Sequence, residues 1–519
     1  MSVLNVEHVT HGFGERQIFN DVSFRLLKGE HVALVGANGE GKSTFIHIIT
    51  GALQPDKGKV EWAKRVSVGY LDQHSSLQAG KSIRDVLRLA FHDLFLLEQE
   101  MLQLYEQINE ADENEMENIL EEAAEIQTTL DHSGFYTLDS RIEQMAVGFG
   151  LLEIGLDRCV DELSGGQRSK VLLTKLLLQN PTILVLDEPT NYLDENHIQW
   201  LVNYLQNYEN AFLLVSHDIP FINQVCNIIY HVNNATITRY VGNYDDFERL
   251  YEEKKKQNEK DYERQQKHME RLEDFIARNK ARVATRGMAN SRAKQLEKIE
   301  VIEKMREKNK PIFHFKMATV NPGRIVYEAR DLVIGYESPL TKPISFQIEK
   351  GQKIAICGVN GLGKSTLLKT ILGIIPPYDG SIVGGDQVIA GYFEQEDSKN
   401  NHRTALEELW AAFPRMSNHE VRTELARVGL SSDNITSQMQ VLSGGENAKA
   451  RLCKVLLQKH NVLVLDEPTN HLDSDAKDAL QQALMEFKGT VILVSHEPYF
   501  YESFVTAIWN IESWTTKII

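Results

Sequence analysis

Two segments of the sequence carry the residue types and spacing that hold phosphate groups. Gly36–Thr44 reads GANGEGKST, and the same GxxxxGK[ST] pattern returns as GVNGLGKST at Gly358–Thr366. Glycine is needed there because backbone N–H groups must turn inward around phosphate oxygens, where a Cβ would obstruct the approach. We expect Lys42 and Lys364 to reach the β- and γ-phosphates of a nucleotide. Each loop therefore predicts a nucleotide site of the P-loop type.

Carboxylates at the ends of two apolar runs supply groups that phosphate hydrolysis needs. Asp187 and Asp466 end short branched runs, which suits a carboxylate that holds Mg²⁺ at the carboxyl edge of a parallel sheet. Glu188 and Glu467 follow directly, so each would polarise the water that attacks the γ-phosphate. The pairs predict metal-assisted hydrolysis of a nucleotide, with a glutamate as the base.

Other paired residues lie at matched distances from these motifs. His217 and His496 each follow their strand aspartate by 30 residues and would contact the γ-phosphate or the attacking water. A histidine alone is more often structural, and the repeated spacing reverses that preference. The remaining pairs are Gln73 and Gln395, interpreted as Mg²⁺ and water ligands, and Phe13 and Tyr336, interpreted as adenine-stacking rings or as ordinary aromatic residues.

The elements that position these residues recur because the chain is an internal duplication. The glycine loops repeat at an offset of 322 residues, whereas the LSGG, LVLDEPTN and VSH segments repeat at an offset of 279. The difference implies an insertion of about 43 residues in the first copy. Each loop follows an apolar strand pattern and precedes a helical one, and Ile183–Leu186 and Val462–Leu465 are typical of buried parallel strands. We expect two homologous α/β domains.

Composition excludes several classes of protein. The 519-residue chain is 42% hydrophobic and 25% charged, which fits globular domains with sizeable cores. It begins without the basic start and apolar core of a secretory signal, and no apolar run is long enough for a membrane helix. Its four cysteines are far apart, which argues against a structural zinc site and for reduced thiols in the cytoplasm.

The combined motifs resemble the ATP-binding cassette (ABC) ATPases. Leu163–Gln167 reads LSGGQ and Leu442–Glu446 reads LSGGE, each upstream of LVLDEPTN and of VSH. The resemblance implies that two cassettes pair head to tail, with ATP and Mg²⁺ between the P-loop of one and the LSGG segment of the other. It implies one site made of Gly36, Ala37, Asn38, Gly39, Glu40, Gly41, Lys42, Ser43, Thr44, Gln73, Asp187, Glu188 and His217 with Ser443, Gly444, Gly445 and Glu446. The other would comprise Gly358, Val359, Asn360, Gly361, Leu362, Gly363, Lys364, Ser365, Thr366, Gln395, Asp466, Glu467 and His496 with Ser164, Gly165, Gly166 and Gln167.

Within those sites, the resemblance gives each residue an expected role. Mg²⁺ would be bound by Ser43, Gln73 and Asp187 in one site and by Ser365, Gln395 and Asp466 in the other. Glu188, Glu467, His217 and His496 would be catalytic. Both glutamates and both histidines are present, so we expect two competent sites; Glu446 departs from the commonest glutamine without an expected loss of activity.

Tandem cassettes without membrane spans resemble the ABC-F family, cytoplasmic translation factors and antibiotic-protection proteins that act on ribosomes. The segment Tyr240–Phe247, YVGNYDDF, opens a linker as it does in that family. The resemblance implies a first ABC domain at 1–245 with an arm at about 90–135, a helical-hairpin linker at 246–315 and a second ABC domain at 316–519. We expect a monomer whose cassettes pair within one chain and whose linker approaches P-site tRNA and the peptidyl-transferase region of the 70S ribosome from the E site.

The linker is basic although the protein is acidic. Net charge is −17 overall, but residues 249–310 sum to +7. A helix from Phe247 to about Ala281 and a returning helix at Ser291–Lys308 are expected, with Gly287 and Asn290 suited to the turn. The region Phe275–Leu296 lacks acidic residues, which predicts RNA contact rather than a solvated spacer. The basic residues there are Arg278, Lys280, Arg282, Arg286, Arg292 and Lys294.

The insertion has the opposite charge. Residues 92–132 contain 13 Asp and Glu and no Lys or Arg, with apolar residues at partly helical spacing. We expect a helical arm that binds a basic ribosomal protein, or else a solvated hairpin without a partner. Two alternatives to a translation factor stay open: a protein of the same family that displaces an antibiotic, and the energising subunit of a membrane transporter, which gives the basic linker no task.

Overall fold

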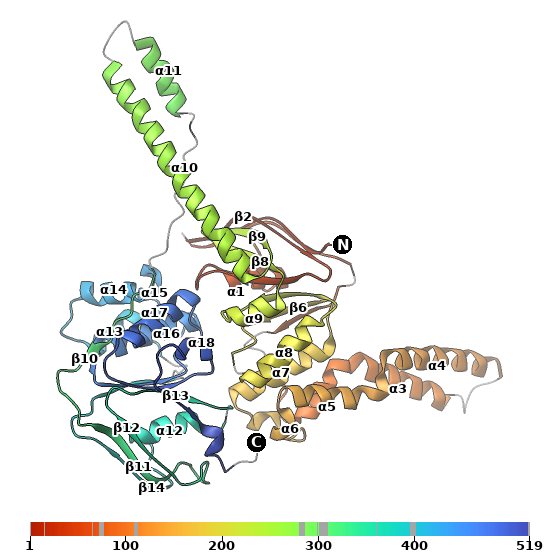
Figure 1. The fold of residues 1–519 in the computed structure, drawn as a ribbon. Helices are drawn as coiled ribbons and strands as arrows, with labels where there is room; N and C mark the ends of the chain where they lie inside the picture. Colours follow the sequence, from red (N-terminus) through yellow and green to blue (C-terminus); the bar gives the residue numbers. More distant parts are fainter. Residues whose placement is uncertain are drawn as a thin grey trace.

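Two α/β bodies lie against each other, and two helical hairpins project from them (Figure 1). The computed structural model describes residues 2–14, 16–64, 66–71, 77–107, 113–191, 193–279, 286–297, 299, 310–359, 361–394 and 401–516. We call the body with the first P-loop cassette 1 and the body with the second cassette 2. Both have the α/β architecture that the duplication predicts.

Cassette 1 is built on a six-stranded sheet in the order β5-β6-β7-β3-β8-β9. All neighbouring strands are parallel except β8 and β9, which form an antiparallel pair. A separate antiparallel sheet has the order β2-β1-β4. The strands are β1 (Ser2–Phe13), β2 (Arg16–Leu27), β3 (His31–Val35), β4 (Lys57–Trp62), β5 (Val68–Leu71), β6 (Ile183–Asp187), β7 (Ala211–Val215), β8 (Ile228–Asn233) and β9 (Thr236–Val241).

The helices of cassette 1 are α1 (Lys42–Thr50), α2 (Ile83–Arg88), α3 (His92–Gln107), α4 (Glu113–Ser133), α5 (Leu138–Gly148), α6 (Leu151–Ile154), α7 (Gly165–Gln179), α8 (Glu195–Gln206) and α9 (Ile219–Val225). They pack around this sheet, except for α3 and α4, which project from it (Figure 1). Side chains of β6 alternate between two cores: Leu184 and Leu186 join one cluster, and Ile183 and Val185 join the other. Because both faces are covered, the strand is continuously apolar.

Cassette 2 repeats the plan with a five-stranded parallel sheet in the order β15-β17-β18-β13-β19. Its antiparallel sheet is β12-β11-β14, and β10 pairs with β16. The strands are β10 (Lys316–Met317), β11 (Ile325–Val333), β12 (Ile344–Glu349), β13 (Lys353–Cys357), β14 (Asp379–Gly384), β15 (Ala390–Phe393), β16 (Lys459–His460), β17 (Val462–Asp466), β18 (Thr490–Val494) and β19 (Ala507–Asn510). The helices are α12 (Lys364–Ile371), α13 (Ala405–Ala412), α14 (Asn418–Arg427), α15 (Ser432–Thr436), α16 (Gly444–Leu457), α17 (Ser474–Glu486) and α18 (Pro498–Tyr501).

The linker is a helical hairpin that projects away from both cassettes (Figure 1). Its long helix α10 spans Tyr244–Asn279, three residues earlier at its start than the sequence predicts, and α11 spans Arg286–Glu297. The guanidinium of Arg292 lies 3.8 Å from the centre of the Phe275 ring, so the two helices contact each other near the tip. The base of α10 is anchored by Phe247, which is buried in the core of cassette 1.

The expected turn at Gly287 and Asn290 is wrong, because both residues lie inside α11. Glycine in a helix interior costs roughly 0.5–1 kcal/mol. The neighbouring Arg, Met, Ala, Lys and Leu residues favour helix, and the contact between Arg292 and Phe275 adds to that preference. The residues between the two helices, 280–285, lie outside the described part of the chain.

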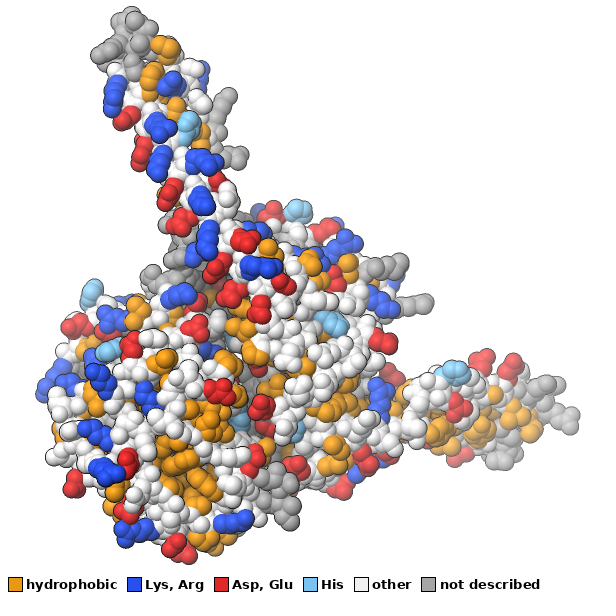
Figure 2. All heavy atoms as spheres, viewed as in Figure 1, with side chains coloured by type: hydrophobic (Ala, Val, Ile, Leu, Met, Phe, Trp, Pro, Cys, Tyr) orange, Lys and Arg blue, Asp and Glu red, His pale blue; other side chains and the backbone are white. Residues whose placement is uncertain are grey.

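The insertion in cassette 1 forms the second hairpin, made of α3 and α4, and projects sideways (Figure 1). Its exposed side chains are not all acidic. Leu96, Leu102, Tyr105, Met116 and Leu120 are each at least 40% exposed. Figure 2 shows hydrophobic and acidic side chains together on the face of the arm in view. The arm is therefore both apolar and negatively charged.

Candidate active sites

Each P-loop joins a central strand to a helix that begins at its lysine. The loops run from β3 to α1 and from β13 to α12, and Gly41 and Gly363 have φ values of 101° and 96°. A Cβ at Gly41 would also collide with the side chain of Ile18. Both positions therefore require glycine on conformational grounds, and Gly41 requires it on steric grounds as well.

The P-loop lysines fold onto the carbonyls of their own loops. Lys42 Nζ donates to Gly36 O at 2.7 Å and to Ala37 O at 3.2 Å. Lys364 Nζ donates to Gly358 O at 2.8 Å and to Val359 O at 3.1 Å. Burial lowers the pKa of both ammonium groups. A phosphate group would restore a strong counter-charge beside each lysine.

The strand aspartates lie where the sequence predicts, at the carboxyl ends of β6 and β17. Asp466 is 1% exposed, its Oδ1 is buried without a hydrogen-bond partner, and its carboxylate interacts with the side chain of Ser365. Burial, with Glu467 nearby, raises the pKa of Asp466 to about 6. An unsatisfied buried carboxylate oxygen next to a serine hydroxyl fits Mg²⁺, which prefers oxygen ligands, so Asp466 and Ser365 would hold it.

Both candidate bases occupy a left-handed backbone conformation. Glu188 has φ 49° and Glu467 has φ 46°, and their N–H groups donate to Val215 O at 2.8 Å and Val494 O at 3.0 Å. Non-glycine residues in this region carry strain that the surrounding structure must hold. Because of this backbone conformation, the side chain of each glutamate points in a different direction from that of the aspartate before it.

The two histidines approach these glutamates. His217 Nε2 lies 3.6 Å from Glu188 Oε1, and His496 Nε2 lies 3.4 Å from Glu467 Oε1. Burial, with Asp187 nearby, raises the pKa of Glu188 to about 8. Burial has the largest effect on Glu467 and raises its pKa, but the hydrogen bond and charge of His496, together with Lys364 and Asn470, outweigh burial, so the pKa of Glu467 lies below its ordinary value. The structure thus brings each predicted Glu–His pair together.

The LSGG segments begin helices α7 and α16. Ser164 accepts a hydrogen bond from Gln167 N, and the Gln167 side chain accepts one from Ser164 N. Ser443 and Glu446 form the same reciprocal pair. Since glutamine and glutamate both serve in this capping box, the change from LSGGQ to LSGGE preserves the helix start.

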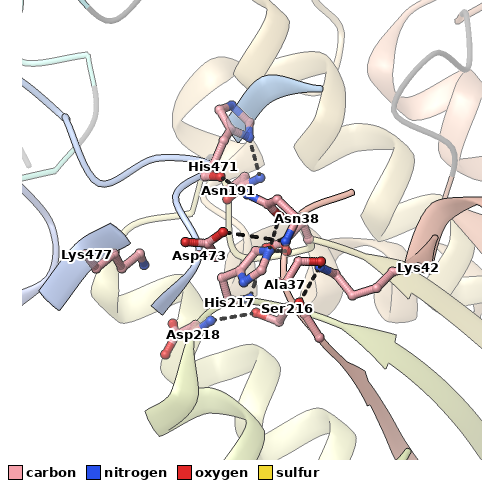
Figure 3. A network of polar contacts seen from close by, with 12 residues as sticks. Ala37, Asn38, Lys42, Asn191, Ser216, His217, Asp218, His471, Asp473 and Lys477 are labelled. Carbon is pink, nitrogen blue, oxygen red and sulfur yellow. Dashed lines mark hydrogen bonds and ion pairs between the residues drawn. The ribbon is translucent and has the colours of Figure 1, made fainter. Parts of the chain in front are cut away.

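The P-loop of cassette 1 contacts cassette 2 directly (Figure 3). Asn38 Nδ2 donates to His471 O at 3.1 Å, and Asn38 N donates to Asp473 Oδ2 at 3.5 Å. Asn38 Oδ1 lies 2.9 Å from His217 Nε2. A Cβ on Gly445 would collide with the Asn38 amide and with the His471 carbonyl. The first P-loop therefore faces the second LSGG segment, and we call this composite site I.

The second P-loop lies near charged residues of cassette 1. The charge of Asp194 acts on Lys364, and that of Glu195 acts on Cys357 and Tyr501. Asp194 caps α8, as Asp473 caps α17. We call this composite arrangement site II, with the LSGG segment Ser164–Gln167 as its expected partner. The cassettes are paired head to tail.

Other predicted residues have varied outcomes. Gln73, Gln395, Asn360, Lys280 and Arg282 lie outside the described residues, as does the side chain of Arg286. Phe13 and Tyr336 are 55% and 64% exposed, so both rings are accessible for stacking on a base. Arg278, Arg292 and Lys294 are exposed near the linker tip. The other P-loop residues, Gly39, Glu40, Ser43, Thr44, Gly361, Leu362 and Thr366, lie in the two loops or the helix starts that follow.

Sequence reasoning missed the residues that join the cassettes. Asn191 and His471 lie side by side, with Nδ2 and Nδ1 3.4 Å apart, and Lys477 is buried nearby. At the offset of 279, His471 matches Tyr192 and Lys477 matches Ile198. These two differences between the copies were a sign in the sequence that the interface residues of cassette 2 have a separate role.

Comparison with known proteins shows the family to which this chain belongs. Residues 19–191 and 341–470 match the family described as ABC transporter, and residues 230–315 match a further ABC transporter family. ABC transporter F family member 2 of Arabidopsis thaliana is 34% identical over 98% of this chain and 75% of its own length. The chain belongs to the ABC-F family. It is an ATPase with two ABC cassettes.

Other relatives of this ABC-F protein match over almost all of its length. The uncharacterized ABC transporter ATP-binding protein YfmM of Bacillus subtilis (strain 168) is 58% identical over the full length of both chains. The solved structure of archaeal ribosome recycling factor aABCE1, in complex with ribosomal stalk protein aP1, has a TM-score of 0.59 at 20% identity, covering 97% of this chain and 87% of that one. That likeness shows a shared tandem-cassette fold. Among the described residues of the ABC-F chain, no helix is both long enough and apolar enough to cross a membrane.

Proposed function

We propose that this ABC-F ATPase acts in the cytoplasm on the 70S ribosome. It binds near the E site when ATP holds the cassettes together, acts through its linker on P-site tRNA and the peptidyl-transferase region, and leaves after hydrolysis. The observation that carries the proposal is the hairpin of α10 and α11, which projects from the paired cassettes (Figure 1) and carries the exposed Arg278, Arg292 and Lys294 near its far end.

The charge along the linker supports contact with RNA at the tip. On the shaft, acidic and basic side chains alternate (Figure 2), and pairs such as Arg264–Asp261 offset each other. Arg278 pairs with Asp274, the last acidic residue before the tip. Beyond it, Arg292 and Lys294 are exposed on a stretch without Asp or Glu. Uncompensated cations of this kind bind phosphate backbones by releasing counterions.

The arm supports a protein partner. RNA would repel its acidic side chains, whereas a basic ribosomal protein would complement them. The exposed Leu102, Tyr105 and Leu120 add apolar area to the same hairpin. A partner with basic and apolar side chains therefore fits the arm best.

The active-site residues would determine when ATP is hydrolysed and therefore when the protein leaves the ribosome. In each site the P-loop lysine would neutralise the β- and γ-phosphates, and Glu188 or Glu467 would take a proton from the attacking water. Ser43 with Asp187, and Ser365 with Asp466, would hold Mg²⁺, which supplies charge neutralisation at the phosphate oxygens. His217 and His496 would orient the water or the γ-phosphate. Because nucleotide lies between cassettes of one chain, a monomer is sufficient.

The linker tip is the part to test. Arg278→Gln with Lys294→Gln removes two tip charges; the matched control, Lys260→Gln with Lys267→Gln, removes two charges from the exposed shaft. Affinity for purified 70S ribosomes should fall at least several-fold for the tip variant, and the slope of log affinity against log salt should become shallower by about 1–2. Equal effects of the tip and shaft variants would contradict a role of the tip in RNA binding.

A further inference from the structure

The segment of cassette 2 that touches the first P-loop also touches the linker. The side chain of Tyr244, in the first turn of α10, interacts with that of Ser474, the first residue of α17. At the returning end of the linker, Lys310 Nζ lies 3.2 Å from Asp475 Oδ1. Both ends of the linker thus meet the start of the same helix.

Tyr244 is fixed to cassette 1 on its other side. Its N–H donates to Asn223 Oδ1 at 2.8 Å, and its ring packs against Phe247 in the core of cassette 1. Burial raises the pKa of its phenol to about 12, as expected for a hydroxyl enclosed between two bodies. The interaction with Ser474 therefore depends on the two cassettes being paired.

The residues just before Ser474 are the ones that hold the P-loop of site I. His471 O and Asp473 Oδ2 accept hydrogen bonds from Asn38. Asp473 is itself held by the buried Lys449 at 2.8 Å and caps α17 through Ala476 N. These contacts hold His471–Ser474, the four residues that end at the first residue of α17. A shift of the P-loop would therefore move the start of α17.

Lys477, one turn further along α17, faces the same interface. Its buried ammonium lies 2.7 Å from Glu497 Oε1 and 3.3 Å from the Tyr499 hydroxyl. Its charge also acts across the interface on Glu188 and Asp218 of cassette 1. A cation supplied by cassette 2 therefore lies in the electrostatic surroundings of the site I base.

Cassette 1 does not reproduce this segment at site II. At the offset of 279, Ser474, Asp475 and Lys477 correspond to Glu195, Asn196 and Ile198. Glu195 acts on Cys357 and Tyr501 of cassette 2 rather than on the linker. Both copies keep the catalytic motifs. The contacts between α17 and the linker, however, lie beside site I.

We propose that His471–Lys477 couples site I to the linker, so that nucleotide at site I, rather than at site II, determines how the base of α10 is held. The coupling is reciprocal, because a contact that favours the ATP-bound arrangement must also favour ATP binding. It goes beyond the proposed ribosomal function and can be tested in the purified protein without ribosomes. Loss of ribosome binding alone would leave it standing.

Site-resolved affinities test the reciprocal effect. Lys364→Ala restricts ATP binding to site I, and Lys42→Ala restricts it to site II. In the first background, Tyr244→Phe and Ser474→Ala should each weaken ATP binding about two- to tenfold, and the double variant should be no worse than the stronger single. In the second background the same changes should have less than a twofold effect. The matched control is Tyr262→Phe, on α10 outside the interface.

Hydrogen exchange supplies a second measurement with Tyr244 and Ser474 unchanged. Adding ATP should slow amide exchange at the base of α10, residues 244–251, in the Lys364→Ala protein and not in the Lys42→Ala protein. Equal protection in both backgrounds, or protection that follows site II, would overturn the proposal. So would affinity losses from Tyr244→Phe that are the same at both sites.

Discussion

At the scale of single residues, the two candidate bases share a backbone and differ in surroundings. Glu188 and Glu467 both follow a strand aspartate and both adopt positive φ. Glu188 accepts from His217 N and lies in the field of Lys477, whereas Glu467 accepts from Asn470 Nδ2 at 2.6 Å. Equivalent sequence positions therefore do not have equivalent electrostatics. We expect the two sites to hydrolyse ATP at different rates.

Replacing both bases should stop hydrolysis while nucleotide binding is retained. Glu188→Gln with Glu467→Gln keeps side-chain volume and removes the proton acceptors, so the rate of phosphate release should fall at least 100-fold. ATP affinity should change much less, because the P-loop contacts remain. Each single variant should lose only the contribution of its own site. A double variant that still hydrolyses ATP at more than a tenth of the normal rate would contradict these assignments.

Gly445 should be intolerant of any side chain. In Gly445→Ala the added methyl group would collide with the Asn38 amide and the His471 carbonyl, and overpacking of this kind costs about 1–3 kcal/mol. Affinity for ATP at site I, measured in the Lys364→Ala background, should fall about tenfold or more. Affinity at site II, measured in the Lys42→Ala background, is the internal control. Unchanged binding at site I would mean that the contact with Asn38 does not form when ATP is bound.

At the scale of elements, the base of α10 packs on cassette 1 against a half-buried histidine. The ring of His231, on β8, lies 5.0 Å from the Phe247 ring and 4.8 Å from the Tyr251 ring. Burial lowers its pKa to about 4. The linker is therefore anchored by an aromatic cluster that requires a neutral imidazole.

This histidine makes stability depend on pH. Its pKa is about 4 in the folded protein and about 6.5 in the unfolded chain, so the unfolded chain binds more protons between these values. The stabilisation is present above about pH 6.5 and is lost as pH falls toward 4, by about 1–2 kcal/mol at pH 5. His231→Phe should reduce the loss of unfolding free energy between pH 7 and pH 5 by that amount in denaturant titrations. An identical pH dependence in the variant would show that the imidazole is not the group responsible.

The elements also show what the sequence predicts and what it does not. P-loops, strand aspartates and LSGG helices were predictable because glycine, branched strand residues and caps specify local geometry. The turn of the linker was not, since Gly287 lies in the first turn of α11, where the helix-forming residues that follow it decide the local structure. The contact of Asn38 with His471 joins residues 433 apart, and no local pattern encodes it. The change from Ile198 to Lys477 between the copies was visible in the sequence, but only the structure shows that Lys477 lies at the interface between the cassettes.

At the scale of the whole molecule, cassette pairing sets the position of the two hairpins. Site I, the start of α17 and both ends of the linker are joined through contacts between residues far apart in the chain. ATP bound between the cassettes, as we propose, would strengthen that pairing, and hydrolysis would release it. The hairpins would then adopt an arrangement suited to the ribosome only while nucleotide is intact.

The most direct test of this claim is co-sedimentation of the Glu188→Gln, Glu467→Gln protein with purified 70S ribosomes in a sucrose gradient. We expect the protein to move with ribosomes in ATP and to stay at the top of the gradient in ADP. Binding that is equal in ATP and ADP would contradict control by cassette closure. Absence of binding in both nucleotides would contradict the ribosomal function and leave the ATPase assignment unchanged.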